Sequence, residues 1–378
     1  MPRMQLSTIH SLVEDLTSIK DKDTLLKHSI QRGLDMWAED WNWSHLTEDT
    51  FITTAAPDTT GTAAITNGSA TVTGTGTSWT AAMKGRKIRF NGENAYYRIS
   101  AVGSTTSITL EVVYQGDTDA TATLSIYKDE YRLPPDLARY KLPRQIENGI
   151  AITDIDSSLF HLADPQTTAE GDPWTWALVG ARQDTYTTGT LSGSSGASVL
   201  TGASTVWTTV EGLGRGTRIT VGTLVYTVKS VDNDSQLTIY ESLSAAIAGG
   251  TAYVLHMDNY RIIMSAIPDT VQNIYFDYQR IPAPLINDQD IPDMPDQFHW
   301  FLVESAKLWL WETKDKSQAA FTQDTLKIWL RGMRKSDSRL STTKKYPRQP
   351  FAGGSRRYQP PMPGNYGIPI PYGGGRYV

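Results

Sequence analysis

Two stretches of this 378-residue chain are copies of each other. Residues 57–128 and 186–257 share a composition rich in Thr, Gly, Ser and Val, and their matching positions keep a nearly constant spacing. The spacing is 128 residues early in the copies and 129 later, as in the pairs Gly68/Gly196, Thr73/Thr201, Gly74/Gly202, Thr77/Thr205, Trp79/Trp207, Tyr97/Tyr226, Val102/Val231, Thr109/Thr238 and Asp129/Asp258. Similarity held at one spacing over so long a stretch indicates an internal duplication.

Each copy is expected to fold as a small all-β module. The copies contain short runs of alternating apolar and polar residues with Gly-rich breaks, a pattern that is typical of strands. In the first copy Asn91-Gly92 lies between two such runs, residues 87–90 and 96–99, and this dipeptide favours a hairpin. Trp79 and Trp207 occupy matching positions, and we expect them to anchor the module cores. The pattern predicts a barrel or sandwich of roughly five or six strands.

The rest of the chain predicts a scaffold that is discontinuous in sequence. Residues 1–56, 129–185 and 258–340 do not share the composition of the copies, and the copies separate them. Insertions are tolerated at exposed loops, where the two ends of the inserted module lie close together. We therefore expect an α+β fold. It comprises a helical-bundle scaffold with a small β-sheet portion, two inserted duplicated β modules, and an extended C-terminal arm of residues 341–378.

Two pairs of helices are expected in the scaffold. Residues 295–333 carry apolar residues at helical spacing and predict two helices in tandem. Residues 7–20 predict a further helix with Ser7 or Ser11 as its cap, and Asp23 is expected to cap the next one. Seven tryptophans lie on or directly after these helices: Trp37, Trp41, Trp43, Trp300, Trp309, Trp311 and Trp329. We expect them in the core or at a subunit interface, and a ligand-stacking platform at the first three is the alternative.

The C-terminal segment concentrates positive charge. From Arg331 onward there are ten Lys or Arg residues and one acid, whereas the whole chain has a net charge of −5, so its body is acidic. Residues 341–378 are dominated by Pro, Gly, Tyr and Arg, and they cannot form a core of their own. The expected contact residues of this arm are Lys344, Lys345, Arg348, Arg356, Arg357, Tyr358, Tyr366, Tyr372, Arg376 and Tyr377. Because Tyr and Arg anchor interfaces, we expect the arm to bind a protein partner, and DNA binding is the alternative.

The sequence offers no arrangement that is typical of an enzyme. It has no cysteine, which excludes disulfides and thiolate chemistry, and its six histidines are scattered without a paired spacing. Asp288, Asp290, Asp293 and Asp296 form the densest acidic group, but their spacing is not that of a calcium loop. We therefore expect no catalytic, cofactor or metal site. No run of about 18 apolar residues and no signal-peptide core is present, so we expect no membrane segment.

Four motifs follow one another along the scaffold segments. They are the Trp-rich WAEDWNWSHL, then YRLPPDLARY, then RIIMSAIPDTVQNIYFDYQRIPAPL, and last MPDQFHWFLVESAKLWLWETKD. In this order they resemble the head-to-tail adaptor (connector) proteins of tailed bacteriophages. The copies, through TGTGTSW and the residues that follow it, are similar to small β modules of phage virion proteins. Two such insertions are not typical of the adaptors.

The resemblance implies a virion protein at the head–tail junction, made in the host cytoplasm. It implies a ring of twelve subunits whose partners are the portal protein, a tail or tail-tube (nozzle) protein and, through the β modules, fibre proteins. It also implies that the C-terminal arm grips the portal while DNA passes through the ring. An acidic body suits such a channel because like charges repel and contacts with DNA stay weak. The competing hypothesis is a β-repeat adhesin or carbohydrate-binding virion protein whose module Trp and Tyr side chains stack on sugars.

Overall fold

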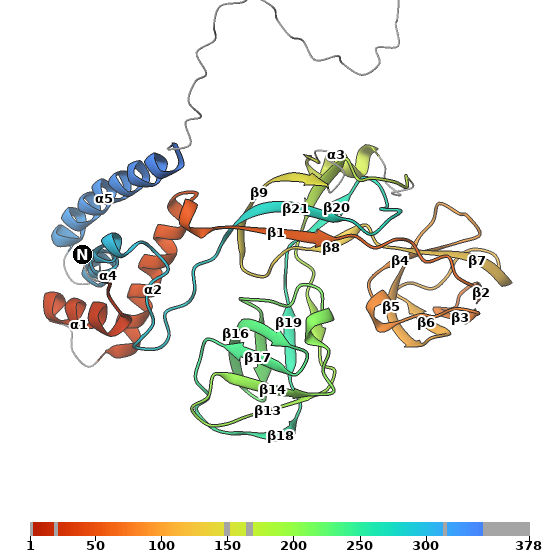
Figure 1. The fold of residues 1–378 in the computed structure, drawn as a ribbon, viewed down its shortest axis with the longest axis horizontal. Helices are drawn as coiled ribbons and strands as arrows, with labels where there is room; N and C mark the ends of the chain where they lie inside the picture. The colour runs from red at the N-terminus through yellow and green to blue at the C-terminus, as the bar shows by residue number, and fades with distance from the viewer. Residues whose placement is uncertain (1–2, 19–21, 147–151, 164–168, 313–315, 343–378) are drawn as a thin grey trace, which may run out of the picture.

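A computed structural model describes residues 3–18, 22–146, 152–163, 169–312 and 316–342. The prediction of a mixed α+β fold is confirmed. N-terminal and C-terminal helices pack together, and the strands of several β-sheets lie between them in the sequence. The helices gather at one end of the molecule and a closed β-barrel lies at the other (Figure 1). Two small sheets lie between these ends, and a second β module extends below them (Figure 1).

Four helices share one core. They are α1 (Leu6–Thr17), α2 (Asp23–Asp40), α4 (Trp300–Glu312) and α5 (Lys316–Thr342). Their buried residues recur at helical spacing, so each helix has an apolar face that it cannot cover alone. Buried side chains from all four meet in this core, including Leu6, Ile9, Leu34, Trp37, Phe301, Leu302 and Met333. The two ends of the chain therefore depend on each other to fold.

The helix boundaries differ from the prediction. α1 begins at Leu6, so Ser7 lies inside its first turn, and the Ser11 hydroxyl donates to the Ser7 carbonyl oxygen (3.0 Å). Neither serine is the N-cap residue, because that position is occupied by Gln5. The Ser11 hydroxyl instead bonds to the carbonyl oxygen four residues back within the helix. Asp23 is the first residue of α2 and not the residue before it. α5 continues to Thr342, so the first two residues of the predicted arm are helical.

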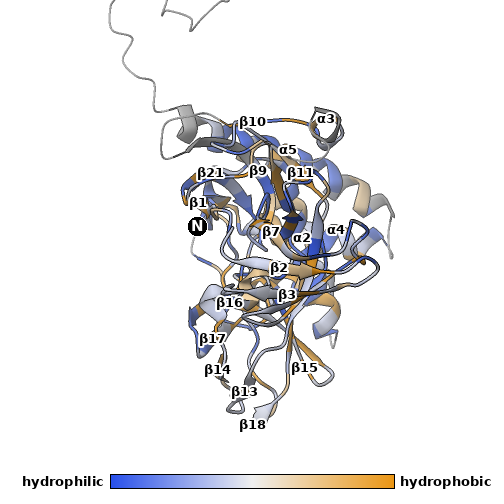
Figure 2. Cartoon of the chain, turned by 90° about the vertical axis from the view of Figure 1, so that its right-hand side faces the viewer, coloured by the Kyte–Doolittle hydropathy of each residue, from blue (hydrophilic) through white to orange (hydrophobic). Residues whose placement is uncertain are grey.

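Two small sheets connect the helices to the β modules. The strand order of one is β1 (Thr47–Thr53), β21 (Asn273–Arg280), β9 (Leu137–Ile146). The order of the other is β10 (Thr153–Asp154), β11 (Thr175–Val179), β20 (Arg261–Met264), β8 (Glu130–Arg132), and the short helix α3 (Ser157–Ala163) contacts β11. Both sheets contribute side chains to one core, among them Tyr131, Trp176, Ile262 and Phe276. In the side view β1 and β21 lie at one margin of the molecule (Figure 2).

The first β module is a closed six-stranded barrel. Its strands are β2 (Thr62–Ile65), β3 (Thr71–Thr75), β4 (Lys87–Phe90), β5 (Tyr97–Ser104), β6 (Ser107–Leu110) and β7 (Asp119–Tyr127), joined in the order β2-β3-β6-β5-β4-β7. Alternate residues point inward along β3, so Val72 and Gly74 are buried while their neighbours are exposed. Closure leaves no free strand edge in this module.

The second β module repeats this order with one strand divided. Its strands are β12 (Asp184–Tyr186), β13 (Thr190–Gly193), β14 (Val199–Ala203), β15 (Arg218–Val221), β16 (Leu224–Asn233), β17 (Gln236–Ile239), β18 (Ile247–Thr251) and β19 (Val254–Met257). β7 pairs with both β2 and β4, whereas in the second module β18 pairs with β13 and β19 pairs with β15. In the second module the counterpart of β7 is therefore interrupted at residues 252–253 and forms two strands, β18 and β19.

Equivalent strand pairs in the two modules keep equivalent registers. Opposed residues in the first module are Val72/Ile108, Ile99/Leu110, Ile88/Tyr97 and Ile88/Ile126. Their counterparts are opposed in the second module as Leu200/Leu237, Val228/Ile239, Ile219/Tyr226 and Ile219/Leu255. Because a shift of one residue would turn every side chain to the other face, an internal duplication accounts for this agreement.

The Asn91-Gly92 turn is longer than the two-residue hairpin that the dipeptide predicts. Both residues have positive φ (51° and 70°), as a tight turn requires, but β5 begins only at Tyr97. In the second module the matching hairpin turns directly, and Val221 lies opposite Leu224. The longer loop of the first module accounts for part of the change in spacing between the copies.

The strands that follow the two modules pair with each other. β8 follows the first module and β20 follows the second, and they are antiparallel neighbours in one sheet. Arg132 lies opposite Arg261, and these residues occupy matching positions of the duplication. The modules are thus held together by main-chain hydrogen bonds between their own exit strands.

Candidate functional site

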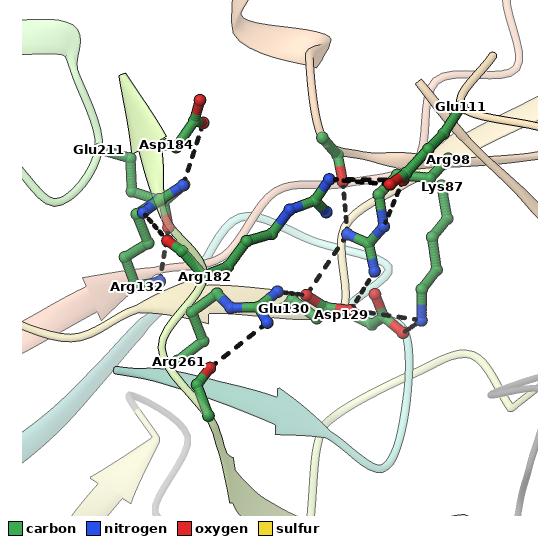
Figure 3. Close-up of polar contacts among 12 residues, drawn as sticks. Lys87, Arg98, Glu111, Asp129, Glu130, Arg132, Arg182, Asp184, Glu211 and Arg261 are labelled. Carbon is green, nitrogen blue, oxygen red and sulfur yellow. Dashed lines mark hydrogen bonds and ion pairs between the residues drawn. The ribbon is translucent and has the colours of Figure 1, made fainter. Parts of the chain in front are cut away.

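Charged side chains of both modules meet around the β8–β20 pair (Figure 3). We call this cluster the junction; it comprises Lys87, Arg98, Glu111, Asp129, Glu130, Arg132, Arg182, Asp184, Glu211 and Arg261. Its members come from the first barrel, the exit strands β8 and β20, the segment before β12, and the second module. The junction therefore connects elements that lie far apart in the sequence.

Glu130 of β8 bridges the first barrel and the second exit strand. Its carboxylate accepts a hydrogen bond from Arg98 of β5 (2.5 Å) and another from Arg261 of β20. Burial alone would raise the pKa of Glu130, but the Arg98 hydrogen bond and charge, with Arg261 and Lys87, hold the pKa below its ordinary value. Glu130 is therefore a charged strut between the two halves of the duplication.

Glu211 of the second module makes the reciprocal connection. Its carboxylate accepts hydrogen bonds from the Lys128 ammonium group (2.5 Å) and from the Arg132 backbone N–H (2.9 Å), both in the exit of the first module. Lys84 pairs directly with Asp184 across the modules at 3.3 Å. Glu130 and Glu211 therefore connect the modules from opposite sides, which restricts the motion of the modules relative to each other.

The deepest ion pair of the junction joins Lys87 and Asp129. The Lys87 Nζ lies 2.6 Å from Asp129 Oδ2, and the two side chains are 4% and 2% exposed. The matching pair of the second module, Arg218 and Asp258, is also formed, but its side chains are 59% and 32% exposed. Equivalent positions of the duplication thus hold a Lys–Asp pair in the interior and an Arg–Asp pair at the surface.

The junction has the chemistry of a structural joint. Its carboxylates are neutralised by Lys or Arg, so the described residues of the junction present no free general base or nucleophile. Within the described ranges no group of three or more His, Asp or Glu side chains is placed to hold a metal ion. Among the same residues, no helix combines the length and apolar character needed to span a membrane.

The predicted acidic group in the connector is dispersed. Asp288 pairs with Lys27, and Asp293 pairs with Arg280. Asp290 instead accepts the backbone N–H groups of residues 286 and 287 (2.8 and 2.7 Å). Separate partners hold these three carboxylates, so they do not converge on one point.

The three N-terminal tryptophans occupy different environments. Trp37 and Trp43 are buried, and their rings stack at 4.8 Å while the Trp43 indole N–H donates to the Trp37 carbonyl oxygen (2.6 Å). Trp41 is exposed, and its indole N–H donates to Asp337 of α5 (3.2 Å). Trp37 and Trp43 thus belong to the core, whereas Trp41 is exposed, with the Arg334 guanidinium 5.8 Å from its ring centre.

The four C-terminal tryptophans are all half-buried. Trp300 and Trp329 pack against the edge of the helical core. Trp309 and Trp311 lie outside it, with the Arg32 guanidinium 3.8 Å from the Trp309 ring centre and the Lys307 ammonium 5.0 Å from that of Trp311. The described part of the chain therefore covers the tryptophan side chains of α4 and α5 only in part.

Trp79 and Trp207 are equivalent core residues of the two modules, and each is 1% exposed. Gly74 and Gly202 make room for them, because a Cβ at these glycines would lie 2.7 Å and 2.6 Å from the tryptophan rings. Neither tryptophan can stack on a bound sugar without unfolding its module. The arm residues Lys344, Lys345, Arg348, Arg356, Arg357, Tyr358, Tyr366, Tyr372, Arg376 and Tyr377 lie outside the described residues.

Several exposed aromatic residues were not predicted from the sequence. Phe51 and Tyr275 are opposite each other on β1 and β21, with ring centres 5.7 Å apart, and both are exposed. Trp174 is 62% exposed in the loop before β11, and Tyr96 is exposed beside β5. Strand alternation carries the signal for the first pair, since Ile274 and its alternate neighbours on β21 face inward.

Comparison with known proteins leaves the fold and the surfaces as the guide to function. No protein-family model matches the chain, and no curated protein matches it. The features that distinguish the molecule are the paired modules, the junction and the half-buried tryptophans of α4 and α5.

Proposed function

We propose that this chain is a structural virion protein, a head-to-tail adaptor. It forms a ring of about twelve subunits under the portal, connects the capsid to the tail and lets DNA pass. In this proposal the helices and small sheets are one discontinuous scaffold, residues 57–128 and 186–257 are inserted duplicates, and residues 341–378 are an extended arm. The protein acts by assembly and not by catalysis.

The observation that carries the proposal is the group of half-buried tryptophans on α4 and α5. Trp300, Trp309, Trp311 and Trp329 surround a helical core that is already filled by aliphatic and aromatic side chains. Tryptophan supplies much contact area and is enriched where subunits bind each other. A second subunit seated on these rings would bury apolar surface that the described residues of one chain leave partly exposed.

The junction supports a role for the modules as rigid projections. Ion pairs and the β8–β20 hydrogen bonds hold the two modules against each other, so they point in fixed directions relative to one another. A fixed projection suits contact with a tail, nozzle or fibre protein, because less motion is lost on binding.

The arm is proposed as the portal-docking element. Residues 343–378 carry six Lys or Arg residues and no acid, together with four tyrosines other than Tyr346. A segment that orders on binding can cover a large partner surface, and its prolines restrict the free chain and so reduce the entropy lost. If the arm instead bound DNA through phosphates, binding would weaken steeply with salt.

Native mass measurement tests the ring. We expect the purified chain, alone or mixed with portal protein, to give a closed ring of about twelve copies, and a monomer under both conditions would overturn the proposal. A chain ending at Leu340 tests the arm. We expect it to lose portal attachment, and attachment should weaken only mildly from low to high salt in the full chain. Undiminished attachment of the shortened chain would reject the docking arm while leaving the ring standing.

The alternative, a carbohydrate-binding virion protein, has weaker support. Its predicted stacking residues, Trp79 and Trp207, are buried, so sugar contacts would fall to exposed tyrosines such as Tyr96. A monomer or trimer that binds glycans on an array would favour this function over the ring.

A further inference from the structure

A hollow of about 470 Å³ opens on the first β module, between the β4–β5 loop and the residues after β6. Tyr96 and Val112 line it and are 39% and 57% exposed. Tyr97, Arg98 and Glu111 complete its floor, and Figure 3 shows the last two side by side. The hollow therefore combines aromatic, aliphatic and polar surface within one small volume.

The duplication gives the second module a counterpart of this surface. Arg98 corresponds to Thr227 and Glu111 to Tyr240. The backbone is the same in both modules: the Glu111 N–H donates to the Arg98 carbonyl oxygen (2.8 Å), and the Tyr240 N–H donates to that of Thr227 (2.9 Å). The two surfaces can therefore be compared position by position.

In the second module this surface is occupied by the chain itself. Asn287 donates its side-chain amide to the Tyr240 carbonyl oxygen (3.0 Å). Asn287 belongs to the proline-containing connector, residues 281–293, which bonds to the N-terminus of α1 through the Leu6 N–H and the Asp290 carbonyl oxygen (2.8 Å). The counterpart surface thus bonds to a polypeptide segment, at the residue where the stretch containing Pro282 and Pro284 ends in a turn.

The charges of the hollow are already satisfied within the chain. Arg98 pairs with Glu130, and Glu111 receives Arg182 at 3.4 Å. A strongly charged ligand such as a phosphate would have to break these pairs, so the hollow favours a neutral occupant. The exposed Tyr96 ring, with the Lys87 ammonium group 4.4 Å from its centre, lies beside the exposed Val112, and the partly buried Tyr97 lies next to it. Such a surface suits proline, whose preformed extended helix docks on aromatic side chains.

We propose that the hollow of the first module binds an extended, proline-containing segment of another protein chain, with a side-chain amide of that segment donating to the Glu111 carbonyl oxygen. The chain's own connector is held at the second module, so it does not serve both surfaces. The longer β4–β5 loop of the first module carries Tyr96 to the rim of this hollow. The proposal requires no ring, so its failure would leave the adaptor function untouched, and the reverse also holds.

The test uses the full chain with fluorotyrosine in place of tyrosine and, as the probe, a synthetic peptide of residues 281–287, which contains Pro282, Pro284 and Asn287 and no charged side chain. We expect a saturable fluorine shift of the Tyr96 signal, which is identified by its loss in Tyr96→Phe. Tyr96→Ala should weaken peptide binding about tenfold, as expected for an anchoring aromatic residue. A peptide with Asn287→Ala should bind severalfold more weakly, since it loses the hydrogen bond of the side-chain amide.

Leu224→Ala is the matched control, because Leu224 is an exposed residue at the hairpin of the second module. It should leave the affinity unchanged. Absence of a saturable shift at millimolar peptide, or equal binding by Tyr96→Ala and the unaltered chain, would overturn the proposal. So would a Tyr96 shift that oligosaccharides produce and the peptide does not. Equal unfolding midpoints for Tyr96→Ala and the unaltered chain establish that the variant is folded.

Discussion

Lys87 and Asp129 form an ion pair that solvent scarcely reaches, at the point where the first barrel meets its exit strand. Arg218 and Asp258 repeat the pair at the second module, where both side chains are much more exposed. One duplicated interaction thus exists in two environments within the same chain, which allows burial to be tested with chemistry and sequence context nearly constant.

Replacing Lys87 by Met is expected to cost about 3–5 kcal/mol in the free energy of unfolding, because it leaves the Asp129 charge buried without a partner. The matched change Arg218→Met should cost less than about 1 kcal/mol, since exposed ion pairs contribute little. Urea unfolding of both variants provides the measurement. Equal losses would show that burial does not govern the strength of this pair.

Glu130→Gln is expected to change how stability depends on pH. The pKa of Glu130 is lower in the folded chain than its ordinary value of 4.5, so the carboxylate stabilises the fold above that value. This contribution is lost as the pH falls through the lower folded-state pKa, because the unfolded chain then binds the proton more readily. The difference between the variant and the unaltered chain should therefore be large at neutral pH and shrink as the pH falls below 4.5. A difference that stays constant over this range would contradict the assignment.

Gly33→Ala is expected to push α2 and α4 apart. A Cβ at Gly33 would lie 2.0 Å from Ser305 Oγ and 3.0 Å from Ser305 Cβ. Overpacking of this kind costs about 1–3 kcal/mol, which outweighs the better helix propensity of Ala. Ser305→Gly should restore much of the loss when both changes are combined, and a double-mutant cycle measures that coupling. A single Gly33→Ala variant that is more stable than the unaltered chain would rule out the close contact.

Trp37→Ala and Trp309→Ala should differ in cost. Trp37 is fully buried, and emptying such a site costs about 3–5 kcal/mol. Trp309 is half-buried under the Arg32 guanidinium, so its loss from the isolated subunit should cost about 1–2 kcal/mol. If Trp309 also contacts a neighbouring subunit, its removal should lower the fraction of assembled ring in native mass spectra. Unchanged assembly would move the subunit interface away from this residue.

Much of the architecture can be predicted from the sequence, because the two copies keep the same strand registers as well as similar residues. Ile88 opposite Tyr97 and Ile219 opposite Tyr226 reproduce the spacing of the copies. Helical periodicity likewise indicates the four long helices. The N-terminal pair is predicted to within a few residues, whereas the pair expected at 295–333 begins only at Trp300 and continues to Thr342. These features depend on local patterns, and local patterns are what a single sequence records.

The junction and the tryptophan environments could not be predicted in this way. β8 has three residues and pairs with β20, which lies beyond the whole second module, so no local sequence pattern predicts the pairing. Glu130 and Arg98 resemble ordinary surface charges until the strands bring them together. Trp309 lies on a helix that is apolar on most sides, so periodicity gives no reason to place it outside the core.

The antiparallel pairing of β8 with β20 sets Arg132 opposite Arg261, its own equivalent, and so creates a local dyad within a single chain. The modules enter this strand pair from opposite ends and present their related surfaces in different directions. A partner that recognises a feature common to both copies would meet two binding points on one molecule. If the partner has two recognition elements, binding of one would raise the local concentration of the other at the second point. A single chain could then bind such a partner with avidity.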